Sequence, residues 1–185
     1  MEKIVTELND ALIIKPQIFF DDRGYFYESY NKEKLKQLGI DINFIQDNES
    51  YSKGKGVFRG LHCQNGEYSQ SKLIRCVKGS IIDVIVDVRK SSPTYLKHIK
   101  VELSEENHLM LLVPKGFLHG FLTLTDEVII QYKVDNYYNK ESDRSIKYND
   151  PSLNIELPFT PSILSLKDKN APYLKDSDIN FIYKK

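Results

Sequence analysis

Short apolar runs recur from Phe44 to Val134, and clusters of Gly, Pro, Asn, Ser or Asp separate them. Some runs alternate apolar and polar residues, and others hold short unbroken apolar stretches. Many short strands at close spacing are typical of an antiparallel sandwich or barrel rather than a parallel α/β sheet. The chain is therefore predicted to be all-β with a few short helices. The runs are FIQD, GVFRGLHCQ, KLIRCV, SIIDVIVDVR, HIKVEL, HLMLLVP, FLHGFLTL and EVIIQYKV.

The N-terminal region combines strand signals with one helix signal. Residues 11–20 are strand-like but interrupted by Pro16, and the DDRG sequence that follows is a turn signal. The segment Tyr25 to Tyr30 alternates aromatic and polar residues, which predicts a strand. The segment Asn31 to Leu38 is the best helix candidate, because it begins with a capping residue and Gly39 follows its end.

The C-terminal tail differs from the rest of the chain. Pro151 to Pro161 is proline-marked coil, and Ser165 to Lys185 is polar with one short helix. The 185 residues suffice for one domain with a sizeable core, and the chain has no internal repeat, low-complexity tract or linker. We therefore expect a single domain over residues 1–185, with a tail from about residue 151 that packs on the barrel.

The composition limits the binding partners and the cellular compartment that we expect. Twenty-six basic residues balance twenty-six acidic ones, whereas a general polyanion binder has a basic excess, so nucleic acid is not an expected partner. The two cysteines, Cys63 and Cys76, have neither CxxC spacing nor the pattern of a disulfide framework. The N-terminal residues lack the features of a signal peptide, and no stretch approaches the ~18 apolar residues of a membrane span. We expect a cytoplasmic protein without membrane association.

His62 lies in the strand-like run GLHCQ. Because side chains alternate between the faces of a strand, Gly60 and Gln64 should share its face, and Leu61 and Cys63 should point the other way. This segment alone favours a buried polar histidine that one neighbour satisfies.

Four further residues carry useful chemistry and an ordinary structural interpretation. A lysine entering a strand, such as Lys72, usually extends its amine to solvent. An inward tyrosine such as Tyr132 is usually a core residue whose hydroxyl finds one partner. His119 lies in an otherwise apolar strand, and Asp168 lies in the polar tail, where most aspartates are solvated. The spacing of these residues leaves both interpretations open.

A metal site between His62 and His119 is the main chemical alternative. Barrels that bind metals offer a His-x-His pair with a carboxylate, whereas this chain has Gln64 two residues after His62, and an amide is a weak ligand. Cys63 should face away from His62 and is not an expected nucleophile. The metal-free interpretation is therefore preferred.

Seven runs occur in order over nearly the whole chain and together resemble the dTDP-4-dehydrorhamnose 3,5-epimerase family. They include the patterns RGLHxQ, PxGFxHGF and SxKD. The resemblance implies a cupin-type jelly roll. The runs are DDRGYFYESYN, QDN, GVFRGLHCQ, SKLIRCVKGSIIDVIVDVRKSSPTY, LVPKGFLHGFLTL, YKVDNYYNKESDRSIKYNDP and ILSLKDK.

The resemblance implies a catalytic set of four residues. His62 matches the general base, and Asp168 matches the residue that orients it. Lys72 matches the residue that stabilises the enolate, and Tyr132 matches the acid on the opposite face of the sugar. The resemblance also implies a substrate-binding set. It comprises Arg23 and Arg59 for the pyrophosphate, Phe26 and Glu28 around the thymine, Gln46 and Asn48 as further contacts, and His119 without a specified role.

The chemistry of such an epimerase requires groups of these kinds. A ketone at C4 acidifies the hydrogens on C3 and C5, so inversion needs a base on one face, an acid on the other and a cation near the enolate oxygen. It needs neither a metal nor a redox cofactor. The resemblance, together with the liability of an unpaired sheet edge, also implies a homodimer in which Leu12 to Tyr30 contributes to the partner's sheet.

Three departures from the family pattern leave alternatives open. Cys63 replaces an aromatic residue, while Ser145 and Tyr148 replace Gly and Trp in the segment before Asp150–Pro151. The first hypothesis is inversion of C3 and C5 of dTDP-4-dehydro-6-deoxy-D-glucose, in deoxysugar biosynthesis. The second is inversion of one carbon, or action on another nucleotide-linked 4-keto sugar. The third is a non-catalytic sugar-nucleotide-binding cupin.

Overall fold

The computed structural model describes residues 1–184, and its regular elements are mainly antiparallel strands, which confirms the all-β prediction. A six-stranded sheet has the order β1-β2-β11-β7-β13-β5, and a five-stranded sheet has the order β10-β8-β12-β6-β14. The first sheet comprises β1 (Glu2–Val5), β2 (Leu12–Lys15), β11 (Met110–Val113), β7 (Lys72–Lys78), β13 (Glu127–Val134) and β5 (Gln46–Lys53). The second comprises β10 (His98–Ser104), β8 (Ser80–Asp87), β12 (Phe117–Thr123), β6 (Phe58–Gln64) and β14 (Asp143–Ser145).

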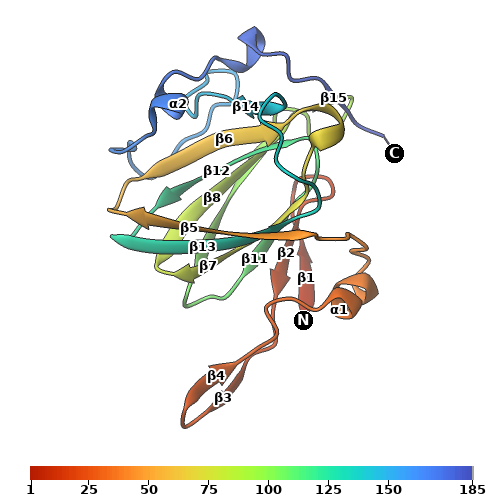
Figure 1. Cartoon of the computed structure of the whole chain (residues 1–185), viewed down its shortest axis with the longest axis vertical. Coiled ribbons are helices and arrows are strands. Elements are labelled where there is room, and N and C mark those ends of the chain that lie inside the picture. The colour runs from red at the N-terminus through yellow and green to blue at the C-terminus, as the bar shows by residue number, and fades with distance from the viewer. Residues whose placement is uncertain (185) are drawn as a thin grey trace.

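The two sheets face each other and enclose the main core (Figure 1). Ile74 and Ile130 enter this core from the six-stranded sheet, and Ile85 and Phe121 enter it from the five-stranded sheet. Towards one end of the sandwich, the inward positions become polar instead of apolar. No helix within residues 1–184 has the length and apolar character that a membrane crossing requires.

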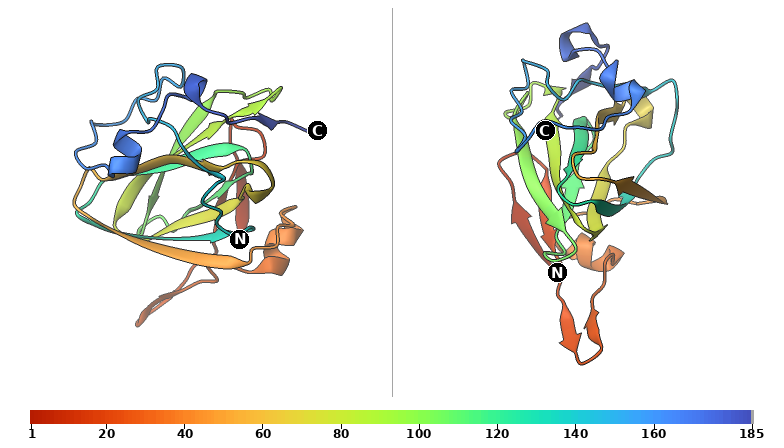
Figure 2. Two further views of the ribbon diagram at one scale, coloured as in Figure 1. Left: turned by 45° about the horizontal axis from the view of Figure 1, so that its top comes forward. Right: turned by 90° about the vertical axis from the view of Figure 1, so that its left-hand side faces the viewer.

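The C-terminal tail covers the outer face of the five-stranded sheet (Figures 1 and 2). Leu153 and Ile179 of the tail pack there against Leu61, Val84 and Leu118. Because both faces of β8 are buried, its sequence is a nearly continuous apolar run rather than an alternating one. The tail holds α2 (Leu166–Lys169), a 3₁₀ turn (Leu174–Asp176) and β15 (Phe181–Ile182). β15 pairs in parallel with β9 (Arg89–Lys90). Outside the tail, another 3₁₀ turn (Gly66–Tyr68) follows β6.

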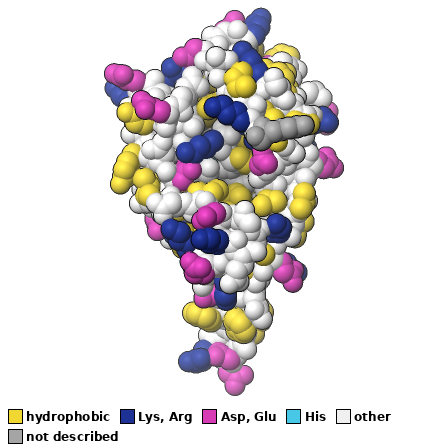
Figure 3. Space-filling model, turned by 90° about the vertical axis from the view of Figure 1, so that its right-hand side faces the viewer, with side chains coloured by type: hydrophobic (Ala, Val, Ile, Leu, Met, Phe, Trp, Pro, Cys, Tyr) yellow, Lys and Arg dark blue, Asp and Glu magenta, His cyan; other side chains and the backbone are white. Residues whose placement is uncertain are grey.

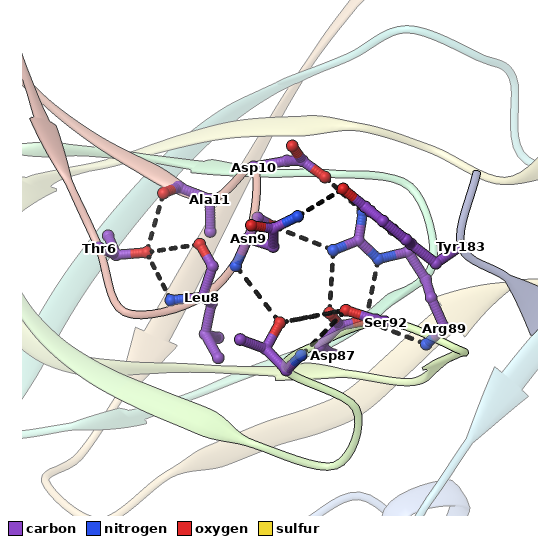
Figure 4. A network of polar contacts seen from close by, with 10 residues as sticks. Thr6, Leu8, Asn9, Asp10, Ala11, Asp87, Arg89, Ser92 and Tyr183 are labelled. Carbon is purple, nitrogen blue, oxygen red and sulfur yellow. Dashed lines mark hydrogen bonds and ion pairs between the residues drawn. The ribbon is translucent and has the colours of Figure 1, made fainter. Parts of the chain in front are cut away.

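A buried ionic cluster joins the tail to the N-terminal turn (Figure 4). The Arg89 guanidinium donates hydrogen bonds to Asp87 at 2.9 Å and to Asp10 at 2.8 Å. Its plane lies against the rings of Phe117 and Tyr183, at 4.6 and 4.8 Å from their centres. The cluster therefore attaches the last strand of the tail to the body.

A hairpin of β3 (Phe19–Asp21) and β4 (Gly24–Phe26) projects away from the sandwich (Figures 1 and 3). The DDRG turn is where the sequence predicted it, but the predicted strand from Tyr25 to Tyr30 ends at Phe26. Aromatic side chains on the hairpin are exposed, including Phe20 at 74% and Phe26 at 67%. Within residues 1–184, no other part of the chain buries these two rings.

The prediction that Leu12 to Tyr30 joins a partner's sheet is wrong for its first four residues. Leu12–Lys15 forms β2, which pairs with β1 on one edge and with β11 on the other. Both edges of β2 are therefore occupied within one chain, whereas the hairpin of β3 and β4 projects away from it.

The predicted helix is confirmed as α1 (Lys32–Gln37). Asn31 caps it, because its side chain accepts a hydrogen bond from the backbone N–H of Lys34 at 3.0 Å. Gly39 follows the helix with a φ of +85°, a conformation that glycine adopts without strain. The helix covers the outer face of the six-stranded sheet through Leu35.

Candidate active site

A cavity of about 440 Å³ lies between the two sheets, at the end where the inward positions are polar. His62 and His119 reach it from β6 and β12 of the five-stranded sheet. Lys72 and Tyr132 reach it from β7 and β13 of the six-stranded sheet. Asp168 reaches it from the tail. Five of the residues singled out in the sequence therefore meet in one place.

His62 and Asp168 form a direct pair. Nε2 of His62 lies 2.6 Å from Oδ1 of Asp168. A carboxylate can only accept a hydrogen bond, so the imidazole carries its proton on Nε2 and leaves Nδ1 to accept another proton. The His62 side chain is 31% exposed and the Asp168 side chain 3%, so the aspartate is buried behind a histidine that faces the cavity.

The short helix α2 holds Asp168 in position. Ser165 caps the helix, and its hydroxyl accepts a hydrogen bond from the backbone N–H of Asp168 at 3.1 Å. Burial alone would raise the pKa of Asp168, but hydrogen bonds from His62, Ser165 and the backbone of Gly60 outweigh it and lower that pKa. The aspartate therefore stays ionised at neutral pH and fixes the orientation of the imidazole.

Burial moves the pKa values of Lys72 and Tyr132 in opposite directions. It lowers the pKa of the Lys72 amine and raises the pKa of the Tyr132 phenol, because it disfavours the charged form of each. The Lys72 amine lies 6.0 Å from the centre of the Tyr132 ring. The cavity thus holds a protonated phenol beside an amine that is easier to deprotonate than an ordinary lysine.

His119 is paired with a buried carboxylate, as His62 is. Its Nε2 lies 2.9 to 3.0 Å from the two oxygens of Asp83, a residue with no exposed surface. Burial lowers the pKa of His119 despite the attraction of Asp83. The side chain is therefore a neutral hydrogen-bonded part of the cavity wall.

Arg59 stands at the rim of the same cavity. Its Nε donates to the hydroxyl of Ser52 at 3.0 Å, and its Nη2 donates to the carbonyl oxygen of Tyr51 at 2.9 Å. Asn48 lies further along β5 and lines an adjoining hollow, where the Gln46 amide donates to its side-chain oxygen at 2.9 Å. β5 therefore presents a row of polar side chains to the entrance.

Like Gln46, the remaining three predicted binding residues line neither the cavity nor the adjoining hollow of their own chain. Arg23 is at the tip of the projecting hairpin and pairs with Asp21. Phe26 ends the same hairpin, and Glu28 binds Lys34 of α1. A single chain does not bring these residues to the catalytic side chains.

Four residues that line the adjoining hollow of about 280 Å³ were not singled out in the sequence, namely Gln70, Tyr138, Asp143 and Lys167. The hydroxyl of Tyr138 donates to Asp143 at 3.2 Å, and the Lys167 amine binds the same carboxylate. Lys167 directly precedes Asp168, and this position was the sequence feature that could have identified it. Tyr138 and Asp143 had no distinguishing pattern in a polar, tyrosine-rich segment.

Gln64 and Cys63, on which the metal and thiol alternatives depend, are engaged elsewhere in the structure. Gln64 donates to the carbonyl oxygens of Tyr68 and Tyr137, so its amide serves the loops and not a ligand. Within residues 1–184, no three His, Cys, Asp or Glu side chains are grouped as a metal ion requires. Cys63 packs in the cluster beneath the tail, on the face opposite His62, and burial raises its thiol pKa to about 12.

Two of the departures from the family pattern lie away from the cavity. Tyr148 packs on Phe58, with ring centres 5.1 Å apart, in the cluster beneath the tail. Ser145 lies on β14 opposite His62 in the register, and its hydroxyl is buried without a hydrogen-bond partner within residues 1–184. Neither residue lines the cavity.

Comparison with known proteins agrees with this geometry. The sequence profile described as dTDP-4-dehydrorhamnose 3,5-epimerase matches residues 5–176. The enzyme of that name from Shigella flexneri is 48% identical over 179 residues, which cover 96% of this chain and 98% of that protein. The crystal structure of the Bacillus anthracis enzyme with TDP and PPi bound has a TM-score of 0.91 and 49% identity, covering 94% of this chain and 99% of that one.

The enzyme from Legionella pneumophila, in complex with dTDP-4-keto-L-rhamnose, has a TM-score of 0.93 and 41% identity. The match covers 100% of this chain and 99% of that one. These likenesses confirm the antiparallel cupin-type fold. The chain belongs to the dTDP-4-dehydrorhamnose 3,5-epimerase family.

Proposed function

We propose that the chain inverts C3 and C5 of dTDP-4-dehydro-6-deoxy-D-glucose to give dTDP-4-dehydro-L-rhamnose. The observation that carries the proposal is the placement of His62 and Tyr132 on opposite sheets across one cavity. A sugar ring held between them meets a base on one face and an acid on the other. Inversion at a carbon requires that arrangement, whereas a scaffold or binding protein does not.

Each inversion is a pair of proton transfers. Nδ1 of His62 removes the proton from a carbon beside the ketone, and the electrons of the C–H bond form the enolate with its charge on O4. The Lys72 cation stabilises that charge, with an effect that grows as water is excluded. The Tyr132 hydroxyl then protonates the same carbon from the other face. Proton exchange with solvent restores both residues, and the second carbon follows the same steps without any net oxidation or reduction.

Isotope exchange tests the reaction and counts the carbons. The protein is incubated with dTDP-4-dehydro-6-deoxy-D-glucose in heavy water, and the sugar is examined by NMR. Deuterium at both C3 and C5 is expected. Deuterium at one carbon would favour a single-site epimerase, and none would contradict the proposal for this substrate. The same incubation with the corresponding GDP sugar checks the choice of nucleotide.

We further propose that the protein is a homodimer in which each hairpin reaches the cavity of the partner. The exposed aromatic rings of the hairpin support this, since clustered exposed apolar side chains mark surfaces that bind another protein. A partner's hairpin would supply Arg23 for the pyrophosphate, beside Arg59, and Phe26 and Glu28 near the base. Sedimentation should show a dimer at working concentration, and a monomer would contradict the proposal.

Mixed dimers test the exchange of hairpins. His62→Asn lacks the base, and Arg23→Ala lacks the phosphate contact. A hybrid of the two variants holds one cavity in which His62 of the Arg23→Ala chain meets Arg23 of the other chain. Mixing should therefore raise kcat/KM per Arg23→Ala chain above that of its homodimer. No rise in hybrids of confirmed composition would place Arg23 at the cavity of its own chain.

We place the protein in the cytoplasm. Its two cysteines are free and buried, as is ordinary for proteins of a reducing compartment. Fractionation of cells that express the chain should find the activity in the cytoplasmic fraction, and recovery with the membranes would contradict this.

A further inference from the structure

The face that β6 presents to the cavity changes in the middle of the strand. Leu61 and Cys63 pack in the cluster beneath the tail, and His62 between them faces the cavity. Strict alternation would put Arg59 on the same outer face as Leu61. Instead Phe58 packs in the outer cluster, and Arg59 lines the cavity with His62.

The register with β12 locates the change. His62 lies opposite His119 and Arg59 lies opposite Phe121, so Gly60 and Leu61 of β6 face only Gly120 of β12. On β12 the alternation is regular, with Phe121 inward and Leu118 and Leu122 outward. The extra residue therefore belongs to β6, as in a β-bulge, and it moves the residues before it to the opposite face.

Two glycines make room for this bulge. A Cβ on Gly120 would lie 2.8 Å from the carbonyl oxygen of Arg59, 3.1 Å from Cα of Gly60 and 3.1 Å from Cζ of Phe58. A Cβ on Gly60 would lie 2.5 Å from Cα of Gly120. All are shorter than the ~3.5–4.0 Å of an ordinary carbon contact. Any side chain at either position would force the strands apart at the bulge.

We propose that the contact between Gly60 and Gly120 is a positioning device for the active site. It turns Arg59 and His62, three residues apart on one strand, into the same cavity. The contact thereby fixes the distance between the group that binds phosphate and the base, and this role rests on the function proposed above.

Gly120→Ala is the variant that tests the device. The φ of Gly120 is not positive, so alanine introduces only the steric contact and no backbone strain. Gly116→Ala is the matched control, because Gly116 directly precedes the same strand and its Cβ would meet Cγ of Arg89 at 2.5 Å, away from the cavity. The control is strained and crowded but leaves Arg59 and His62 in place.

Two measurements are made on each folded variant, well below its melting temperature. Calorimetry with dTDP reports on Arg59, and deuterium exchange into the 4-keto sugar reports on His62. We expect Gly120→Ala to bind dTDP more weakly and to exchange deuterium on the order of 10²-fold more slowly, since a displacement of ~1 Å has that effect on catalysis. Gly116→Ala should retain both properties while its melting temperature falls.

If Gly120→Ala does not fold, the double variant Gly120→Ala with Phe58→Leu removes the one close contact with a side chain and keeps the two with the backbone of β6. Phe58→Leu alone is its reference. Folded Gly120→Ala with both properties equal to those of Gly116→Ala would overturn the inference, and so would a loss in only one of them. Absence of exchange in the unmodified protein would instead contradict the proposed function, and dTDP affinity would then decide the role of the bulge.

Discussion

Oδ1 of Asp168 lies 2.6 Å from Nε2 of His62, although 106 residues separate them along the chain. The pair exists because the tail folds back over the five-stranded sheet and α2 presents the carboxylate behind the imidazole. The base of the proposed reaction therefore depends on a segment outside both sheets.

Asp168→Asn should lower kcat without abolishing it. The amide keeps most of the shape but loses the charge that stabilises the protonated imidazole and holds its tautomer. The loss should be smaller than that of His62→Asn, which removes a general base that contributes ~10²–10⁴ in rate. Steady-state kinetics check this. The control is Asp176→Asn, an exposed carboxylate in the same tail, and equal kcat values for the two variants would contradict the role of Asp168.

Much of this arrangement followed from the sequence, and the reasons for the exceptions are physical. The strand-like runs and the cap at Asn31 are local patterns, and local patterns predicted them correctly. The contact between His62 and Asp168 is long-range, so only resemblance to a family indicated it. The face of Arg59 was not predictable from alternation, because the bulge depends on the close approach of Gly60 to Gly120.

In the N-terminal region, the sequence predicted a longer strand than the structure contains. Tyr25 to Tyr30 has the alternation of a strand, yet only Tyr25 and Phe26 of this segment are in one. A strand needs a partner, and after Phe26 the facing strand β3 has no residue left to pair with it. Alternation therefore predicted which residues could extend but not where pairing stops.

Lys72 should set the alkaline limit of activity. Its burial lowers the pKa of the amine below the ordinary 10.5, so the cation is lost at a lower pH than in a free lysine. The pKa of Tyr132 is raised above 10.0, so the phenol stays protonated over that range. kcat/KM should therefore fall as pH rises towards 10.5. Lys72→Arg should move that fall to higher pH, since a guanidinium stays charged to ~12.5 or beyond.

The pH profile of Tyr132→Phe is the control for that assignment. The variant is slower at every pH, but its residual kcat/KM should show the same alkaline fall as the unmodified protein. A fall that disappears in Tyr132→Phe and persists in Lys72→Arg would assign the alkaline limit to the tyrosine instead.

Arg59→Ala and Arg23→Ala should weaken nucleotide binding more than they slow the proton transfers. Each removes a charge-assisted contact with phosphate that contributes ~1.5–3 kcal/mol. Calorimetry with dTDP alone should therefore show a dissociation constant raised by about 10-fold to 150-fold in each variant. Lys55→Ala removes an exposed cation outside the cavity and should leave the affinity unchanged. Unchanged affinity in both arginine variants would place the pyrophosphate elsewhere.

Arg89→Ala should destabilise the fold strongly. It leaves Asp87, which has no exposed surface, without its ionic partner, and loss of one member of a buried pair costs about 3–5 kcal/mol. Burial would raise the pKa of Asp87, but hydrogen bonds from Arg89, Ser92 and Thr94 lower it. The stability from this carboxylate is therefore present above its ordinary pKa of 3.8 and is lost as pH falls through the lower value of the folded state.

Chemical unfolding at neutral pH measures the effect of Arg89→Ala. The neighbouring Lys90→Ala is the control, because the Lys90 side chain is exposed and, within residues 1–184, its amine bonds only to the side chain of Asn180. It should change the free energy of unfolding by no more than ~0.5 kcal/mol. Similar unfolding midpoints for the two variants would show that the cluster in Figure 4 contributes little to stability.

Deuterium exchange in His62→Asn and Tyr132→Phe tests the central claim most directly, namely that the base and the acid face each other across the cavity. Each variant is incubated with the 4-keto sugar in heavy water, and NMR follows label and configuration at C3 and C5. His62→Asn should show neither exchange nor inversion, because no enolate forms. Tyr132→Phe should show exchange with little inversion, because His62 still removes a proton and returns a deuteron to the same face. Exchange at the unmodified rate in His62→Asn, or full inversion in Tyr132→Phe, would contradict the account.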